Sequence, residues 1–206
     1  QALGAALAVH PPPGALLGEG GDPNIIGHRR GPVFRIVRKD YEPDTMKTTG
    51  HIIQALRSTG AQRAKVDAIG VGVGAVNRGK ELGHPFVAVK VSEQAQDPEQ
   101  FINLRAEGFW HLRTLFQDGQ IDIDPDDDDL AAQLCALKYS ANSAGKLVIE
   151  SKREIKKDIK QSPDEADCCM LTFLQIPEKK KYRGVWGRKK KSNDPNASVL
   201  RNRKAA

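Results

Sequence analysis

The sequence lacks long apolar runs and has few cysteines, and both absences limit the classes of protein it can encode. No apolar stretch approaches the roughly 18 residues of a membrane-spanning helix, and residues 2–9 lack the basic leader of a signal peptide. The three cysteines (Cys135, Cys168 and Cys169) form no CxxC pair, which is typical of reduced thiols in a cytosolic protein. We therefore expect a soluble intracellular protein that does not act at a membrane.

Several catalytic and metal-binding signatures are also absent. The sequence contains no G-x-S-x-G pattern and no Walker A pattern, and its five histidines show no metal-ligand spacing. The acidic run 122–129 looks like a calcium loop, but Asp127 stands where glycine is required and Gln133 where a bidentate glutamate is required. We interpret this run as a solvated loop that caps a helix.

Positive charge is concentrated at the C-terminal end. The net charge is +6, yet residues 179–206 hold 11 Lys and Arg against one acid, so the other 178 residues carry a net charge of −4. Such tails commonly bind nucleic acid, and Lys189, Lys190 and Lys191 are the candidate contacts. Tyr182 and Trp186 would permit stacking on bases. The alternative interpretation is a solubilising tail without a ligand.

Two acidic segments far apart in the sequence are the candidates for chemistry. Asp67 lies near the end of a predicted strand, residues 64–69, at the edge where open α/β sheets place their ligand sites. Asp164 and Asp167 are three residues apart near a predicted helix start, so they point in a similar direction. Carboxylates that meet repel each other unless a cation lies between them, and the pairing therefore predicts a divalent-metal site and phosphodiester chemistry.

Each of these acids also has a simpler interpretation. Asp67 would serve equally well as a surface residue that caps a turn. Asp164 is explained by favourable interaction with the helix dipole. Asp167 is explained less well in this way, because an apolar run follows it and a buried carboxylate needs a partner.

The pattern of helix and strand signals predicts a mixed α/β sheet that is flanked by helices. The last predicted helix begins with Ser162, Pro163 and Glu165, which together predict a capping box with proline in the first helical position. The predicted elements are strands over 25–28 and 33–37, a helix over 45–59, a strand over 64–69, a helix over 75–82, a strand over 85–91, helices over 98–116 and 129–137, a strand over 147–150 and a helix over 162–174.

Five segments carry a resemblance to a known family. They are residues 66–74, 101–107, 133–139, 145–152 and 162–167, in this order. Together they resemble the C-terminal nuclease domain of the large terminase subunit of tailed bacteriophages and prophages, over about residues 18–174. The resemblance implies a ribonuclease-H-like fold, cleavage of double-stranded viral DNA concatemers during head packaging, and two Mg²⁺ or Mn²⁺ ions held by three acidic residues.

By this resemblance, Asp67 corresponds to the second acidic ligand and Asp167 to the third, and both are the expected catalytic residues. Asp164 corresponds to an accompanying acid in the same segment and is a further expected metal ligand. Lys152 is expected to approach the DNA phosphates, although a solvated charge is the commoner role of a single lysine.

The first acidic ligand of the family belongs on the opening strand, in a pattern like Asp-Pro-Ala-Gly-Glu-Gly-Gly-Asp. When the sequence is aligned on residues 18–22, Ala15 stands at the ligand position. We therefore expect impaired cleavage, with Glu19 or Asp22 as substitute ligands, because loss of one anionic ligand weakens the hold on two cations.

The leading hypothesis is a DNA endonuclease domain of a packaging terminase in the host bacterial cytoplasm. The resemblance implies double-stranded DNA, the phage portal and the small terminase subunit as partners. We divide the chain into an irregular segment (1–17), the ribonuclease-H-like domain (18–177) and a basic tail predicted to be disordered (178–206). One alternative is a cleavage-incompetent remnant that binds DNA or packaging partners. Another is a small-molecule enzyme, because Gly70, Gly72 and Ala75 fit a loose dinucleotide-binding pattern, although Lys90 stands where an acid is needed.

Overall fold

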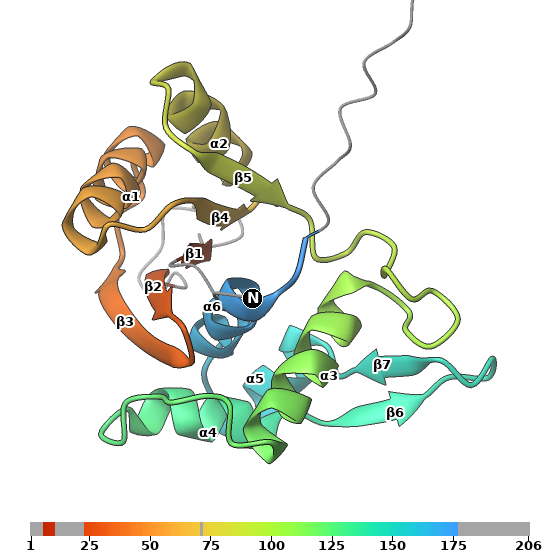
Figure 1. Ribbon diagram of the computed structural model, residues 1–206. Coiled ribbons are helices and arrows are strands. Elements are labelled where there is room, and N and C mark those ends of the chain that lie inside the picture. The colour runs from red at the N-terminus through yellow and green to blue at the C-terminus, as the bar shows by residue number, and fades with distance from the viewer. Residues whose placement is uncertain (1–5, 11–22, 71, 177–206) are drawn as a thin grey trace, which may run out of the picture. The chain divides into compact units, whose positions relative to one another are not determined.

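The computed structural model describes residues 6–10, 23–70 and 72–176. Its central element is a five-stranded sheet of β1 (Ala6–His10), β2 (Asn24–Arg30), β3 (Val33–Asp40), β4 (Ala64–Asp67) and β5 (Phe86–Val89), in the order β3-β2-β1-β4-β5 (Figure 1). The pairs β1–β2 and β2–β3 are antiparallel, whereas β1–β4 and β4–β5 are parallel. This mixed sheet confirms the predicted fold class.

Helices cover both faces of the sheet. Leu7 and Val9 of β1 share a core cluster with Ile52, which lies on a helix of the first face. Ala8 belongs to the opposite face because side chains alternate along a strand, and its carbonyl accepts a hydrogen bond from Cys168 Sγ at 3.4 Å. The first face is therefore covered by α1 (Thr45–Thr59) and α2 (Gly72–Glu81), and the second by α6 (Asp164–Phe173).

Some of the remaining elements pack against α6. Two helices pack against it, α3 (Leu104–Gln117) and α4 (Asp128–Ala136). A small separate sheet of β6 (Tyr139–Ala141) and β7 (Leu147–Ile149) leads into α5 (Lys152–Ile159). Several segments far apart in the sequence therefore meet at α6.

The expectation of irregular structure over residues 1–17 is wrong at β1. This short apolar segment lies between β2 and β4 and is buried from both faces, which explains why it shows no alternation of polar and apolar residues. The strand ends at His10, directly before Pro11. The other residues of the segment, like the tail from residue 177 onward, lie outside the described residues, and the division into three parts stays a prediction.

Most other predicted elements are confirmed, with three differences. The hairpin of β2 and β3 and the helix α1 are present, and α1 is capped by Asp44 and ends at Gly60 with φ of 66°. The prediction missed β6 and α5. It also began α3 too early, because Asn103 accepts a hydrogen bond from Ala106 N at 2.9 Å and so starts that helix at Leu104.

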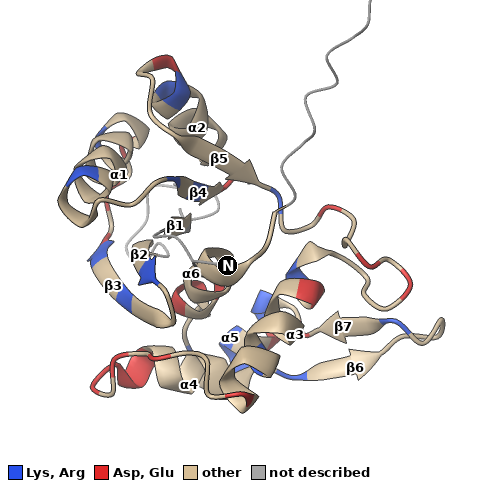
Figure 2. Cartoon of the chain, in the orientation of Figure 1, with Lys and Arg blue, Asp and Glu red and all other residues tan. Residues whose placement is uncertain are grey.

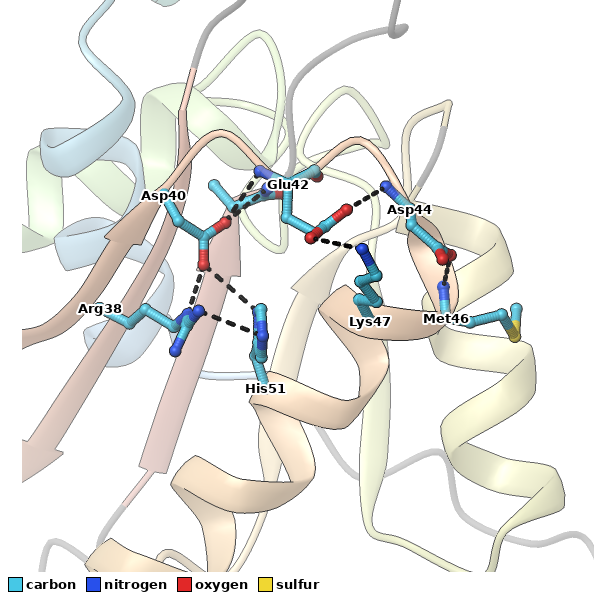
Figure 3. Close-up of polar contacts among 8 residues, drawn as sticks. Arg38, Asp40, Glu42, Asp44, Met46, Lys47 and His51 are labelled. Atoms are coloured by element: carbon cyan, nitrogen blue, oxygen red, sulfur yellow. Dashed lines mark hydrogen bonds and ion pairs between the residues drawn. The ribbon is translucent and has the colours of Figure 1, made fainter.

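Figure 3 shows the corner where the chain passes from β3 into α1. The carboxylate of Asp40 accepts hydrogen bonds from Arg38 Nε and, at 3.1 Å, from the backbone N–H of Glu42. Its Oδ2 also lies 3.3 Å from His51 Nδ1 on α1. Because one carboxylate contacts the strand, the connection and the helix, it fixes the direction in which α1 leaves the sheet.

The close approach of α6 to the sheet depends on Gly27 of β2. A Cβ atom at this position would lie 2.4 Å from the Phe34 ring and 2.8 Å from Cys168 Sγ. We expect Gly27→Ala to lower the free energy of unfolding by about 1–3 kcal/mol through overpacking. The control is Gly50→Ala in the exposed middle of α1, where nothing lies within 4 Å. That change should raise the free energy of unfolding by about 0.5–1 kcal/mol, and urea unfolding followed by circular dichroism compares the two.

Candidate functional site

Three carboxylates are buried in the first turn of α6. Asp164, Glu165 and Asp167 are 1%, 2% and 3% exposed. The N-terminus of a helix stabilises negative charge, but carboxylates buried to this extent also need cationic or hydrogen-bonding partners. The structure supplies those partners from four other elements.

Lys152, the first residue of α5, joins two of these acids. Its Nζ lies 3.2 Å from Asp164 Oδ1 and 2.7 Å from Asp167 Oδ2. Burial alone would lower the pKa of Lys152, but attraction by Asp167 and Asp164 outweighs it and the pKa is raised. The amine is therefore protonated at neutral pH. A capping box between Ser151 and Glu154 starts the helix and so places Lys152 at this point.

Arg105, in the first turn of α3, holds Asp167 from the other side. Its Nε donates to Asp167 Oδ1 at 3.1 Å, and its Nη1 donates to the backbone carbonyl of Glu150 at 2.9 Å. The guanidinium also lies over the Phe109 ring, 4.9 Å from its centroid. Arg105 thus ties α3, the end of the small sheet and α6 together around one carboxylate.

Glu165 belongs to a separate network that holds α6 in place. Its Oε1 lies 2.6 Å from Lys39 Nζ of β3, and its Oε2 accepts from Gln133 Nε2 of α4 at 3.2 Å. Burial raises the pKa of Glu165, and Lys39 opposes that shift. We interpret Glu165 as a structural residue, because both of its carboxylate oxygens contact neighbouring elements of the fold.

The predicted capping box of α6 is wrong. No side chain in the adjoining sequence caps this helix, and Pro163 stands at the N-cap position rather than inside the helix. Gln133 Oε1 of α4 instead accepts from the backbone N–H groups of Glu165 and Ala166, at 2.9 and 3.1 Å. Ser162 Oγ donates to Asp164 Oδ1 at 2.8 Å. This cap comes from another helix and satisfies two backbone donors at the start of α6, and local sequence could not predict it.

Asp67 ends β4 and is 4% exposed. It lies on the same face of the strand as Lys65, since residues two apart share a face. Lys65 Nζ donates to the carbonyls of Leu171, Thr172 and Leu174 at 3.0, 3.0 and 2.6 Å. These three bonds use every proton of an ammonium group, although burial lowers the pKa of Lys65 to about 7. The face of β4 that carries Asp67 is therefore turned toward α6, the helix of Asp164 and Asp167.

The end of β1 lies beside the end of β4. In the parallel pair, Val9 is opposite Val66. β1 continues to His10 and β4 to Asp67, each one residue beyond this pair. His10 is thus the residue at the carboxyl end of β1, the first described strand.

The structure brings together only some of the candidate residues that were predicted from the sequence. It joins Asp164 and Asp167 through Lys152, but among the described residues no group of three or more His, Cys, Asp and Glu side chains is gathered to hold a metal ion. Metal binding by Asp67, Asp164 and Asp167 stays a prediction. The other candidates, Ala15, Glu19, Asp22, Lys189, Lys190 and Lys191, lie outside the described residues.

Sequence reasoning missed three residues that shape this site, namely Lys65, Arg105 and Gln133. Arg105 and Gln133 lie within two of the five segments on which the family resemblance rests, and that is the signal that marks them. Lys65 lies just before another of those segments and is a cation in a short buried strand. A buried cation in a strand indicates a specific acceptor, which here is the end of α6.

Neither protein-family models nor curated proteins give a match to this sequence. Solved structures do match it. The nuclease domain of the large terminase subunit gp2 of bacterial virus Sf6 is 23% identical, with 85% of this chain and 89% of that chain covered and a TM-score of 0.67. A lysine-to-alanine mutant of that domain, solved with manganese and β-thujaplicinol, is 21% identical over the same shares with a TM-score of 0.68. The large terminase nuclease of thermophilic phage G20c with bound magnesium is 14% identical, with 83% and 82% covered and a TM-score of 0.59.

This chain has the fold of a phage terminase nuclease domain. The ribonuclease-H-like architecture implied by the five sequence segments is thereby confirmed. The sheet does not favour the dinucleotide-binding alternative, because three of its five strands form an antiparallel array rather than an all-parallel sheet. Within the described part of this terminase-nuclease fold, no helix combines the length and apolar character needed to cross a membrane.

The ion pairs of Lys152 give a stability prediction. Lys152→Met leaves two buried carboxylates without their shared cation, so the free energy of unfolding should fall by about 1–3 kcal/mol at pH 7 in the absence of divalent ions. The matched control is Lys157→Met on the exposed side of the same helix, which should change it by less than about 0.5 kcal/mol. Urea unfolding measures both changes. Equal losses would show that Lys152 is not the partner that stabilises these acids.

Proposed function

We propose that this chain is a metal-dependent endonuclease domain that cuts double-stranded DNA concatemers during phage DNA packaging. The observation that carries the proposal is the pair of buried carboxylates, Asp164 and Asp167, which share one cation inside a terminase-nuclease fold. The likeness to nuclease domains solved with manganese or magnesium supports a divalent ion and does not select between the two. The phage portal, the small terminase subunit and a location in the host bacterial cytoplasm follow from the same proposal.

The residues fit a divalent cation. Two aspartate carboxylates, buried and already paired with one ammonium group, are hard oxygen donors of the kind that Mg²⁺ and Mn²⁺ accept. Asp67, Asp164 and Asp167 are the residues that would hold one or two such ions. When bound, the metal would polarise a phosphoryl oxygen and lower the pKa of a water molecule.

The side chains around these acids have separable roles in the proposal. Arg105 positions Asp167 by donating to Oδ1, which leaves Oδ2 directed to Lys152. Lys152 neutralises the acids while no divalent ion is present, and its ammonium group can turn to a DNA phosphate when an ion takes its place. Asp67 contributes negative charge from the sheet, on the face turned toward α6.

A cleavage-incompetent DNA-binding remnant is the alternative function. Two observations favour it, namely the ammonium group of Lys152 on the acids and the presence of a histidine where the opening strand ends. Under this alternative, the basic tail with Lys189, Lys190 and Lys191 would still hold DNA, because attraction to phosphates does not require a metal.

Cleavage of supercoiled plasmid tests the proposal. The wild-type chain should nick plasmid with Mn²⁺ or Mg²⁺, and Asp67→Asn or Asp167→Asn should lower the rate by about 100-fold or more, since several kcal/mol of metal stabilisation would be lost. Asp118→Asn, an exposed acid at the end of α3, is the control and should leave the rate unchanged. Salt-sensitive DNA binding with no metal-dependent cleavage would instead support the remnant.

Two substitutions locate the missing first ligand. His10→Asp puts an acidic residue at the end of β1, the strand that pairs with β4, so Mg²⁺-dependent nicking should rise by about tenfold, and Mn²⁺ should raise the melting temperature more than in the wild type. Ala15→Asp is the comparison, because sequence alignment alone selects that position. A gain with Ala15→Asp and none with His10→Asp would show that the alignment, and not the strand register, identifies the ligand position.

A further inference from the structure

We propose that the outer face of α5 is a track for the phosphate backbone of duplex DNA, which it guides to the acids of α6. This inference rests on the proposed function for the identity of the polyanion as DNA. The proposed track does not include the basic tail and is made of described residues alone. The surface consists of Arg153, Lys156, Lys157 and Lys160.

The orientation of α5 leaves most of its basic residues exposed. Ile155 is its one fully buried residue and anchors the helix on the rest of the protein. Lys152 is partly buried and reaches the acids of α6, whereas the four residues of the proposed track are exposed. A helix held by so narrow an apolar contact presents most of its circumference to solvent.

The segment that contains α5 carries an excess of positive charge. Residues 152–160 hold five Lys and Arg against two acids. Glu154 is used in the capping box with Ser151. Asp158 is paired with Lys138, which lies in the connection between α4 and β6. The acids of this segment therefore serve the helix end and a neighbouring lysine, and the segment keeps a net positive charge (Figure 2).

The spacing of these basic residues along the sequence places them on one side of α5. Arg153, Lys156 and Lys160 follow one another at intervals of three and four residues, and Lys157 is adjacent to Lys156, so the four form a row along one side of the helix that ends at its C-cap residue, Lys160. With a rise of about 1.5 Å per residue the row covers about 10 Å, which corresponds to about three successive phosphates at about 3.4 Å per strand.

The basic row of α5 adjoins the acids of α6. The row begins beside Lys152, whose Nζ lies 2.7 Å from Asp167 Oδ2. A strand that follows the row would therefore reach Asp164 and Asp167 at the N-terminal end of the helix.

Salt-dependent DNA binding tests the track. The full chain, kept in EDTA so that no cleavage occurs, is titrated with a fluorescent 30-base-pair duplex at several KCl concentrations. The triple variant Arg153→Gln, Lys156→Gln and Lys157→Gln should bind about tenfold more weakly at low salt. The slope of log K against log salt should shrink by about 2–3, because each lost phosphate contact removes about 0.9.

The control removes the same charge from the other face of the sheet. Arg57→Gln, Arg78→Gln and Lys80→Gln change three exposed cations of α1 and α2, and the slope should change by less than about one. Both triples keep the basic tail, so its contribution cancels. Equal slopes in the two triples would overturn the proposal.

A charge-preserving variant guards against loss of folding. Arg153→Lys, Lys156→Arg and Lys157→Arg should retain the wild-type slope, and a slope as low as that of the glutamine triple would contradict the track. Cleavage with Mn²⁺ separates this inference from the proposed function. A slope effect in a chain that never cleaves supports the track and refutes the nuclease, whereas cleavage with no slope effect supports the nuclease and refutes the track.

Discussion

The ammonium group of Lys152 between Asp164 and Asp167 is the interaction on which the rest of the site depends. Two carboxylates in one helical turn, each almost completely buried, cannot both stay ionised without a cation close to them. The chain solves this by starting α5 at Lys152, so that its first side chain enters the gap. A site that holds a cation between two carboxylate oxygens is also a site at which different cations bind with different strength.

The surrounding fold is arranged to hold α6 still while it carries this charge. Gln133 satisfies the first backbone N–H groups of α6, and Lys65 satisfies three of its last carbonyls, so both ends of the helix are fixed by side chains from other elements. Gly27 lets the helix approach the sheet closely at Cys168. Each contact satisfies buried polar groups or fills space in the core, and together they place Asp164 and Asp167 with little freedom to move.

The sequence predicted those parts of the structure whose signals are local. Asp44 and Gly60 marked α1 at both ends, and the β2–β3 hairpin followed from its turn at Gly31. β1 was missed because its five residues become a strand only through pairing with β2 and β4, which lie 14 or more residues away. The three aspartates could be singled out from the sequence. Lys152 and Arg105, which contact Asp164 and Asp167, and Gln133, which caps α6, reach this helix only through the packing of α3, α4 and α5 around it.

The end of β1 bears directly on the choice between a metal and the lysine. Asp67, Asp164 and Asp167 carry three negative charges when ionised, and Lys152 and Arg105 carry two positive charges. A divalent ion would add two more positive charges, so it must displace the ammonium group or receive another anion in order to bind. An acidic residue at position 10, at the end of the strand that pairs with β4, would supply a further anion, whereas a histidine supplies none. Under the proposed function, the residue at the end of this central strand therefore contributes to the balance between lysine and metal as the counter-ion for α6.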